Sequence, residues 1–285
     1  MSKVEFIKSE DEKASDKPKS RDSREFEFTM AHFNRIQEAL YEHAGIVLSD
    51  QKQNLAYSRI VRRLRDLGLE SFDSYFDYIN RHPTEFPNFI NALTTNLTSF
   101  FREKHHFDFL RNTIIAQRKI SGDKRISVWS AGCSEGHEPY SLAMTFKEEI
   151  EDIANWNIKI LASDIDSNML RDAQLGEYMA ERVAKLPKEQ IHRWFYRGTG
   201  SRAGKVKIKP ELKEFIQFRQ INLIANWPIN TPLDIVFYRN VMIYFDAQTQ
   251  NRLLERMAEK IKVGGHLFIG HSETIRNNTK AFRLV

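Results

Sequence analysis

Two segments of this sequence combine the residue types of a nucleotide-binding site. Gly132 and Gly136 lie in a turn that follows the apolar run 126–129, in a chain that contains only 12 glycines. A glycine turn after a strand lets a backbone approach a ligand closely. Asp164 follows a second apolar run, 160–162, where a carboxylate can accept hydrogen bonds from both hydroxyls of a ribose. The glycine spacing also suits an ordinary strand-to-helix turn, and Asp164 could instead cap the next helix.

The spacing favours a ligand that has a ribose but no pyrophosphate. The turn has a G-x-x-x-G pattern instead of the G-x-G-x-x-G of dinucleotide sites, and no P-loop lysine is present. Asp164 also lies farther from the turn than the acid of a nicotinamide site does. S-adenosylmethionine is a ligand of this kind.

Alternating strands and helices must position these residues. We expect strands at 125–129, 158–162, 216–220, 235–238 and 266–269, and helices at 138–150, 169–175 and 247–261. This alternation predicts an α/β fold with a doubly wound (Rossmann-like), mostly parallel sheet covered on both faces. Residues 193–215 break the pattern, and we interpret them as a small antiparallel β insertion.

The preceding part of the chain has a different character. Apolar residues at helical spacing, interrupted by glycines and prolines, predict a small all-helical domain over 26–100. Residues 101–123 predict a connecting helix, which leaves 124–285 for the sheet domain. Residues 1–25 hold seven basic and seven acidic residues and few apolar ones, which predicts a disordered tail.

Composition narrows the class of protein. The single cysteine excludes a disulfide framework and a Cys-rich zinc module. No apolar run approaches the roughly 18 residues of a membrane helix, and the N-terminus is charged where a secretory signal is apolar. We therefore expect a cytoplasmic protein with no membrane insertion and no bound metal.

Several segments, in the same order, resemble the chemotaxis receptor methyltransferases, the CheR family. They read NALTTNLTSFFR (91–102), EPYS (138–141), ASDID (162–166), NL (222–223), RNVMIYF (239–245) and GHSE (270–273). The resemblance covers roughly residues 30–280. It implies an enzyme that transfers a methyl group from S-adenosylmethionine to glutamate side chains of receptor cytoplasmic helices. The products would be glutamate methyl esters and S-adenosylhomocysteine.

The resemblance also implies roles for single residues. Arg102 would hold the substrate carboxylate near the methyl group, and the Tyr244 hydroxyl would point at the reacting groups. A surface ion pair for Arg102 and a core position for Tyr244 are the alternatives. The implied cofactor-binding residues are Asn96, Thr98, Arg102, Glu138, Asp164, Asn222, Leu223, Arg239 and Asn240. Among these, Asp164 would bind the ribose, Asn222 and Leu223 would flank the adenine, and Glu138 would pair with the amino group.

The sequence departs from the family pattern in two places. His137 stands where the family usually carries Glu, and Glu135 stands where it carries Thr. We therefore expect a different charge beside the methionyl group. The family also continues past the position of Val285 with a closing strand, so we expect an incomplete sheet edge.

A basic helical segment is the first expected contact with the substrate protein. Residues 52–65 carry a charge of +5, and Arg59, Arg62 and Arg63 share one helix face. In the family the corresponding helix meets the methylated receptor region, and a Glu-rich receptor bundle would complement it. A merely solvated helix face is the alternative.

A glycine-rich loop is the second expected contact. Gly198, Gly200 and Gly204 resemble the loop of family members that bind a receptor's C-terminal tether peptide, whereas a plain flexible turn is the alternative. Residues 193–219 carry +6, so with a net charge of +5 the chain outside the two basic segments is acidic, at −6. Two separate basic patches fit docking on an acidic receptor better than a continuous nucleic-acid stripe.

Two other functions remain open at this stage. One is a non-catalytic receptor-binding adaptor that has lost activity through the change at His137. The other is a nucleic-acid methyltransferase, which the basic pI of 9.1 invites. Residues 237–240 read FYRN, however, and lack the Asn/Asp-Pro-Pro-Tyr segment that holds a flipped amino base.

Overall fold

The computed structural model describes residues 24–275 and 281–285. The chain divides into two compact units, one ending at Thr94 and the other beginning at Thr95. This division falls six residues before the predicted domain end at residue 100. The reason is that Phe100 is buried in the core of the second unit, and Ser134 Oγ donates a hydrogen bond to Asn96 O there.

The first unit is all-helical, as predicted. It contains α1 (Met30–Ala44), α2 (Gln53–Leu67), α3 (Phe72–Arg81) and α4 (Phe86–Leu93), with single 3₁₀ turns at Asp50–Lys52 and Pro83–Glu85. Thr29 and Ser71 cap the first turns of α1 and α3, and left-handed Gly45 and Gly68 end α1 and α2. Its core holds the apolar faces of these helices.

The predicted tail lies almost entirely outside the described residues. Its last two residues are described, and both contact α2: Arg24 Nη2 donates to Asn54 Oδ1 at 2.8 Å, and Glu25 pairs with Arg65. For residues 1–23, which lie outside the described residues, the tail stays a prediction.

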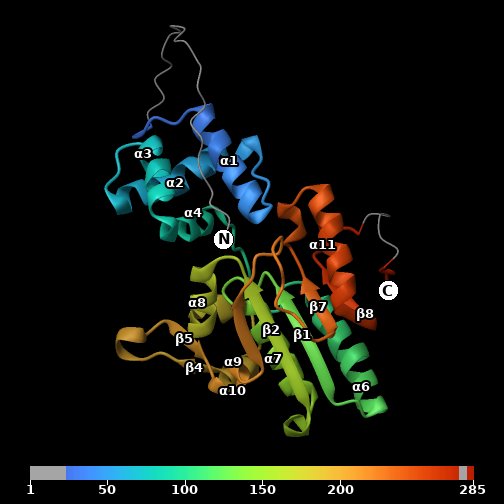
Figure 1. The fold of residues 1–285 in the computed structure, drawn as a ribbon. Helices are drawn as coiled ribbons and strands as arrows, with labels where there is room; N and C mark the ends of the chain where they lie inside the picture. The colour runs from blue at the N-terminus through green and yellow to red at the C-terminus, as the bar shows by residue number, and fades with distance from the viewer. Residues whose placement is uncertain (1–23, 276–280) are drawn as a thin grey trace. The chain divides into compact units, whose positions relative to one another are not determined.

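The second unit is built on a five-stranded sheet whose neighbouring strands are all parallel. Its order is β6-β2-β1-β7-β8 (Figure 1). The strands are β1 (Arg125–Ala131), β2 (Asn157–Asp164), β6 (Ile216–Gln220), β7 (Leu233–Tyr238) and β8 (Ile261–Ile269). The chain reverses direction across the sheet between β1 and β7, and ligands bind at such switch points in open α/β sheets. The predicted fold class is confirmed.

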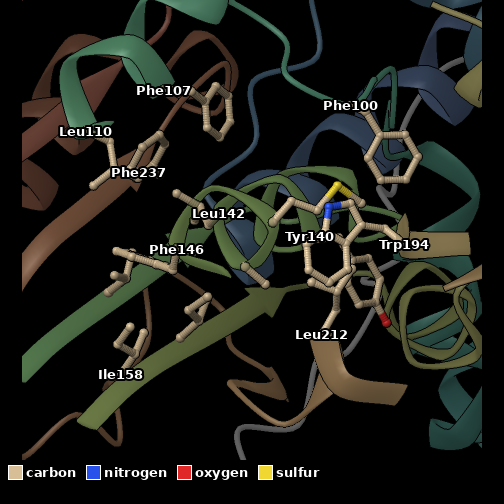
Figure 2. Packing of buried hydrophobic residues seen from close by; sticks show 14 of the residues in the cluster. Phe100, Phe107, Leu110, Tyr140, Leu142, Phe146, Ile158, Trp194, Leu212 and Phe237 are labelled. Carbon is tan, nitrogen blue, oxygen red and sulfur yellow. The ribbon is translucent and has the colours of Figure 1, made fainter. Parts of the chain in front are cut away.

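Helices cover both faces of this sheet. One face buries Ile126, Val128, Ile160 and Phe237 against Leu142 and Phe146 of α7 (His137–Glu149), as Figure 2 shows in part. The alternate residues of the strands, such as Trp129 and Val236, pack on α11 (Ala247–Lys260). α8 (Ser167–Leu175) follows β2. None of the helices in the described ranges combines the length and hydropathy needed to span a bilayer.

The predicted connecting helix belongs to the core of the second unit. It runs as α5 (Lys104–Phe109), a π-helical turn (Leu110–Ile115) and α6 (Ala116–Ser121). Phe107, Leu110 and Ile115 are buried in the same cluster as α7. This segment is therefore part of the sheet's cover and not a free linker.

The predicted β insertion is a separate antiparallel sheet of three strands in the order β3-β5-β4. The strands are β3 (Glu177–Met179), β4 (Phe195–Arg197) and β5 (Lys205–Ile208), with α9 (Lys188–Trp194) between the first two and α10 (Pro210–Lys213) after the last. The predicted range of 193–215 omitted β3, because three residues directly after Gly176 are too few to show alternation.

Candidate active site

The carboxyl ends of the parallel strands bring the predicted cofactor residues together. The glycine turn follows β1, Asp164 ends β2, and Arg239 and Asn240 follow β7. The backbone N of Ile221 donates to Asp164 O at 3.0 Å. That bond joins the end of β2 to Ile221, the residue before Asn222.

The two turn glycines are required by close packing. Gly132 and Gly136 have φ of +91° and +87°. A Cβ on Gly132 would lie 2.4 Å from Val241 Cγ2, and one on Gly136 would lie 2.9 Å from Ala173 Cβ. The space beside Gly132 is thus filled by Val241, although we expected it to serve the ligand.

Asp164 is held as an acceptor at the edge of the sheet. Its Oδ2 accepts from Ser134 N at 2.8 Å and its Oδ1 accepts from Asp166 N at 2.9 Å. A carboxylate has about four acceptor sites, so capacity remains for a ribose diol. Asp166, instead of Asp164, caps α8, which removes the helix-cap alternative. Burial raises the pKa of Asp164 to about 6, against the opposing hydrogen bonds from the backbone.

Glu138 and Arg239 form a buried ion pair. Arg239 Nη1 donates to Glu138 Oε2 at 3.0 Å, and Ser130 Oγ donates to Glu138 Oε1 at 2.7 Å. Burial raises the pKa of Glu138, whereas the charge of Arg239 opposes that rise. The Arg239 side chain is only 2% exposed. These two predicted cofactor residues therefore bind each other, and the buried Arg239 holds Glu138 in place.

The segment 95–102 runs beside these loops. Asn96 Nδ2 donates to Asp166 Oδ2 at 2.9 Å. Tyr244 Oη donates to Thr95 O at 3.0 Å, and Arg102 Nη1 donates to Leu97 O at 2.9 Å.

Arg102 and Tyr244 each donate a hydrogen bond to a backbone carbonyl of the segment 95–97. Burial raises the pKa of Tyr244, and the positive charge of Arg102 opposes that rise. The Arg102 side chain is one-third exposed, and its Nε lies as far as 4.0 Å from the Glu103 carboxylate. Arg102 therefore does not form a close surface ion pair with Glu103.

The remaining predicted cofactor residues differ in exposure. Thr98 and Asn222 are half-buried, and Asn222 Oδ1 accepts from Ile224 N at 3.2 Å. Leu223 is buried in the cluster that contains α11. Asn240 has a left-handed backbone, with φ of +58°.

Two acids at this edge were not predicted as site residues. Glu273 Oε2 accepts from Asn240 N at 2.9 Å and from Gly270 N at 2.6 Å. Glu103 joins several loops; burial alone would raise its pKa, but bonds from His271 and the charge of Arg239 lower it to about 2. Glu273 belongs to the GHSE segment and Glu103 directly follows Arg102, and these positions were the available signals.

His137 is a buried aromatic residue that brings no charge to the site. Its side chain is fully buried, with ring centroids 4.5 Å from Phe100 and 4.7 Å from Tyr178. Burial, followed by the charge of Arg182, lowers its pKa to about 3, so the ring is neutral at physiological pH. A neutral ring at position 137 carries no charge where the family usually carries the negative charge of Glu, and this agrees with the expected difference.

The basic face of α2 is smaller than predicted. Arg59 Nη1 donates to Ala92 O and Thr94 O, and Arg63 pairs with the buried Glu85 at 2.8 Å. Arg62 is exposed, and its guanidinium has no hydrogen bond or ion pair to any described residue. Of the three arginines, Arg62 is thus the one wholly available to a partner.

The glycine loop joins η6 (Gly200–Arg202) to its neighbouring strands. Gly198 N donates to Lys205 O at 2.9 Å, and a Cβ at Gly198 would lie 2.1 Å from Arg202 O. Gly200 and Gly204 have positive φ and open space around them. Gly198 therefore has a packing role, whereas the other two shape an exposed turn.

Comparison with known proteins identifies both units. Residues 31–94 match the CheR methyltransferase all-alpha domain, and residues 96–285 match the CheR methyltransferase SAM binding domain. The chain is 46% identical to chemotaxis protein methyltransferase 2 of Pseudomonas aeruginosa, over 92% of this chain and 93% of that one. It is 45% identical to the chemotaxis protein methyltransferase of Escherichia coli, over 89% and 88% of the two chains. This chain belongs to the CheR methyltransferase family.

Proposed function

We propose that this protein transfers a methyl group from S-adenosylmethionine to glutamate side chains of chemoreceptor cytoplasmic helices, giving glutamate methyl esters and S-adenosylhomocysteine. The observation that supports this most is that the segment 95–97 binds three of the loops at the sheet edge. Tyr244 Oη donates to Thr95 O, Arg102 Nη1 donates to Leu97 O, and Asn96 Nδ2 donates to Asp166, two residues after the acid Asp164. The names of the similar proteins, chemotaxis protein methyltransferases, point to the same substrate class.

The residues at the sheet edge suit the cofactor. Asp164 has acceptor capacity left for the ribose hydroxyls. In this proposal Asn222 and Leu223, which follow the Ile221 that donates to Asp164 O, flank the adenine. When bound, S-adenosylmethionine supplies an electrophilic methyl group. Both oxygens of Glu138 already accept from protein donors. In this proposal Glu138 therefore binds the methionyl amino group only while it stays paired with Arg239.

The chain's own contribution is positioning. A glutamate carboxylate with a pKa of about 4.3 is already ionised at neutral pH, so no general base is required. Arg102 can hold that carboxylate through paired hydrogen bonds. In this proposal the half-buried Tyr244 lies next to the bound carboxylate and would exclude water from the reacting oxygen, which would strengthen the electrostatic contact.

Two surfaces suit the receptor. Arg62 on α2 offers an available positive charge to an acidic helical bundle. In the small sheet, β4 is an edge strand, and a receptor's C-terminal peptide can add to it as a further strand. Such tethering raises the effective concentration of the enzyme near its glutamates.

Methyl transfer to receptor membranes tests the proposal. The protein is incubated with membranes that contain cognate receptors and with S-adenosylmethionine labelled in the methyl group, followed by mild alkali. Glutamyl methyl esters release volatile labelled methanol, whereas N-methyl groups stay bound. Absence of alkali-labile label on every cognate receptor contradicts the proposal.

A calorimetric titration with S-adenosylhomocysteine addresses the adaptor alternative. An enzyme that uses the site described above binds the product, whereas an adaptor without activity needs no such binding. Binding that weakens in Asp164→Asn, together with alkali-labile label, supports catalysis at this site.

A further inference from the structure

We propose that Glu103 is a positioning residue that holds Arg102 in place for the substrate carboxylate. The inference rests on the role proposed above for Arg102. Arg102 lies between two residues with left-handed backbones, Phe101 at φ +50° and Glu103 at φ +55°. Residues other than glycine rarely adopt this conformation, and it persists only where the surroundings determine it.

The N-terminal side of this turn is held by the helix after the glycine turn. Phe101 N donates to Ser141 Oγ at 3.0 Å, and Ser141 lies in α7. The Phe101 ring packs edge-on against Phe107 with a centroid separation of 5.1 Å. Phe101 is thus fixed by both its backbone and its ring.

The Glu103 carboxylate fixes the other side. Its Oε1 accepts from His271 Nδ1 at 3.0 Å and from Asn240 Nδ2 at 3.4 Å. Its Oε2 accepts from the backbone N of His271 at 3.2 Å. One carboxylate therefore ties the Arg102 turn to the loops after β7 and β8.

Arg239 links this carboxylate to the backbone of Arg102. Arg239 Nη2 lies 3.5 Å from Glu103 Oε2 and also donates to Arg102 O. Its Nη1 is held by Glu138. Because a single guanidinium contacts both the Glu103 side chain and the Arg102 carbonyl, the negative charge of Glu103 fixes the position of Arg102.

The same carboxylate could be taken for a metal ligand, since ligand atoms of Glu103, His105 and His106 lie within 4.8 Å of one another. Two cationic groups argue against that reading: Arg239 Nη2 is 3.5 Å and Arg102 Nε is 4.0 Å from the carboxylate. They would repel a metal ion at this point. The geometry assigns Glu103 to the two arginines.

Glu103→Gln tests the role because it keeps the side-chain shape and removes the charge. We expect kcat for receptor methylation to fall by about 10- to 100-fold, the effect of a small misplacement of a reacting group. The receptor KM and the S-adenosylhomocysteine Kd should stay within about twofold, since ground-state binding is retained. Glu189→Gln is the matched control, because Glu189 is an exposed residue of α9 and has no proposed role in the site.

Coupling to Arg102 separates positioning from a general structural effect. In an Arg102→Ala background, Glu103→Gln should cause no further loss of kcat, because the residue that it positions is already absent. His271→Ala provides a second variant, since its side chain is 68% exposed and the change removes one donor to Glu103. It should lower kcat in the same direction but less.

Several outcomes would overturn the inference. Losses that multiply in the double variant, or an unchanged kcat in Glu103→Gln, would show that Glu103 does not act through Arg102. Full turnover of Arg102→Ala would instead remove the role of Arg102, and this inference with it. A wild-type protein that forms no alkali-labile product would contradict the proposed function itself.

Discussion

Asp164 should make cofactor binding depend on pH. Burial raises its pKa to about 6, and ribose hydroxyls donate to the ionised form. Below pH 6 the carboxyl is protonated and must lose its proton on binding, so affinity falls as the pH falls; above it, affinity is constant. The S-adenosylhomocysteine Kd at pH 5 should be about tenfold higher than at pH 7.5, by proton linkage at one site. Calorimetry at the two pH values measures it.

Asp164→Asn is the control for this pH dependence. The amide has nearly the same shape but no proton to lose, so its weaker binding should not vary between the two pH values. An equally steep profile in the variant would show that another group titrates. His106 and His137 do not fill that role, because burial lowers the pKa of His106 to about 4 and that of His137 to about 3.

His137 should be replaceable without loss of cofactor binding. Both of its ring nitrogens are buried with no hydrogen-bond partner among the described residues, and such groups cost about 1–3 kcal/mol each. His137→Leu has a similar volume and removes both, so we expect a gain of about 1 kcal/mol after some loss of ring contacts. The unfolding temperature should rise by about 2–4 °C.

The Kd for S-adenosylhomocysteine should stay unchanged in His137→Leu, since the ring faces Phe100 and Tyr178. A lower unfolding temperature together with weaker binding would show that the imidazole supports the site. His137→Gln, which keeps a polar group there, should be less stable than the Leu variant.

At the scale of elements, the sequence predicted what local patterns encode. Short apolar runs that alternate with helical segments predicted the five parallel strands, because strands buried on both faces are apolar throughout. β3 was not predicted from the sequence, because it has only three residues. The contacts of Glu103 could not be predicted, because they join residues 103, 240 and 271. Only the fold brings these residues together.

The edge strand β4 gives a test of peptide addition. Gly198 N–H donates inward to Lys205 O, so the N–H of the neighbouring Arg197 points to the open edge. Arg197→Pro removes that donor and leaves the ladder to β5 intact. Affinity for a receptor C-terminal peptide should fall by about tenfold or more, from one lost hydrogen bond and the clash of the ring. Fluorescence anisotropy with a labelled peptide measures it.

Arg197→Ala is the matched control for the edge-strand test. It removes the same charge and keeps the backbone donor, so it should weaken the peptide much less than Arg197→Pro. Equal losses in the two variants would assign the effect to the side chain. S-adenosylhomocysteine affinity should be normal in both, which checks that the sheet domain is intact.

At the scale of the whole molecule, charge is unevenly distributed. The net +5 is the difference between two basic segments and an acidic remainder, and this balance could be counted from the sequence. The number of arginines that are left without a partner inside the protein could not be counted from the sequence. Arg63 is used by Glu85, and Arg59 by the carbonyls of Ala92 and Thr94 at the end of α4, because buried acceptors in the first unit need donors. Arg62 therefore carries the prediction for receptor docking.

Receptor docking should be sensitive to salt and to the charge at Arg62. Raising ionic strength from about 50 mM to about 300 mM shortens the range of exposed charges, so the receptor KM should rise while the S-adenosylhomocysteine Kd stays constant. Arg62→Glu should raise the receptor KM at low salt by about fivefold or more and flatten its salt dependence. Its unfolding temperature should be unchanged, since Arg62 has no ion pair to a described residue.

Arg63→Glu is the contrasting variant: it places a second acid beside the buried Glu85 and should destabilise the helical unit. If Arg62→Glu leaves the KM unchanged while retaining the full salt effect, the receptor docks elsewhere, and the basic residues of the small sheet become the next to reverse.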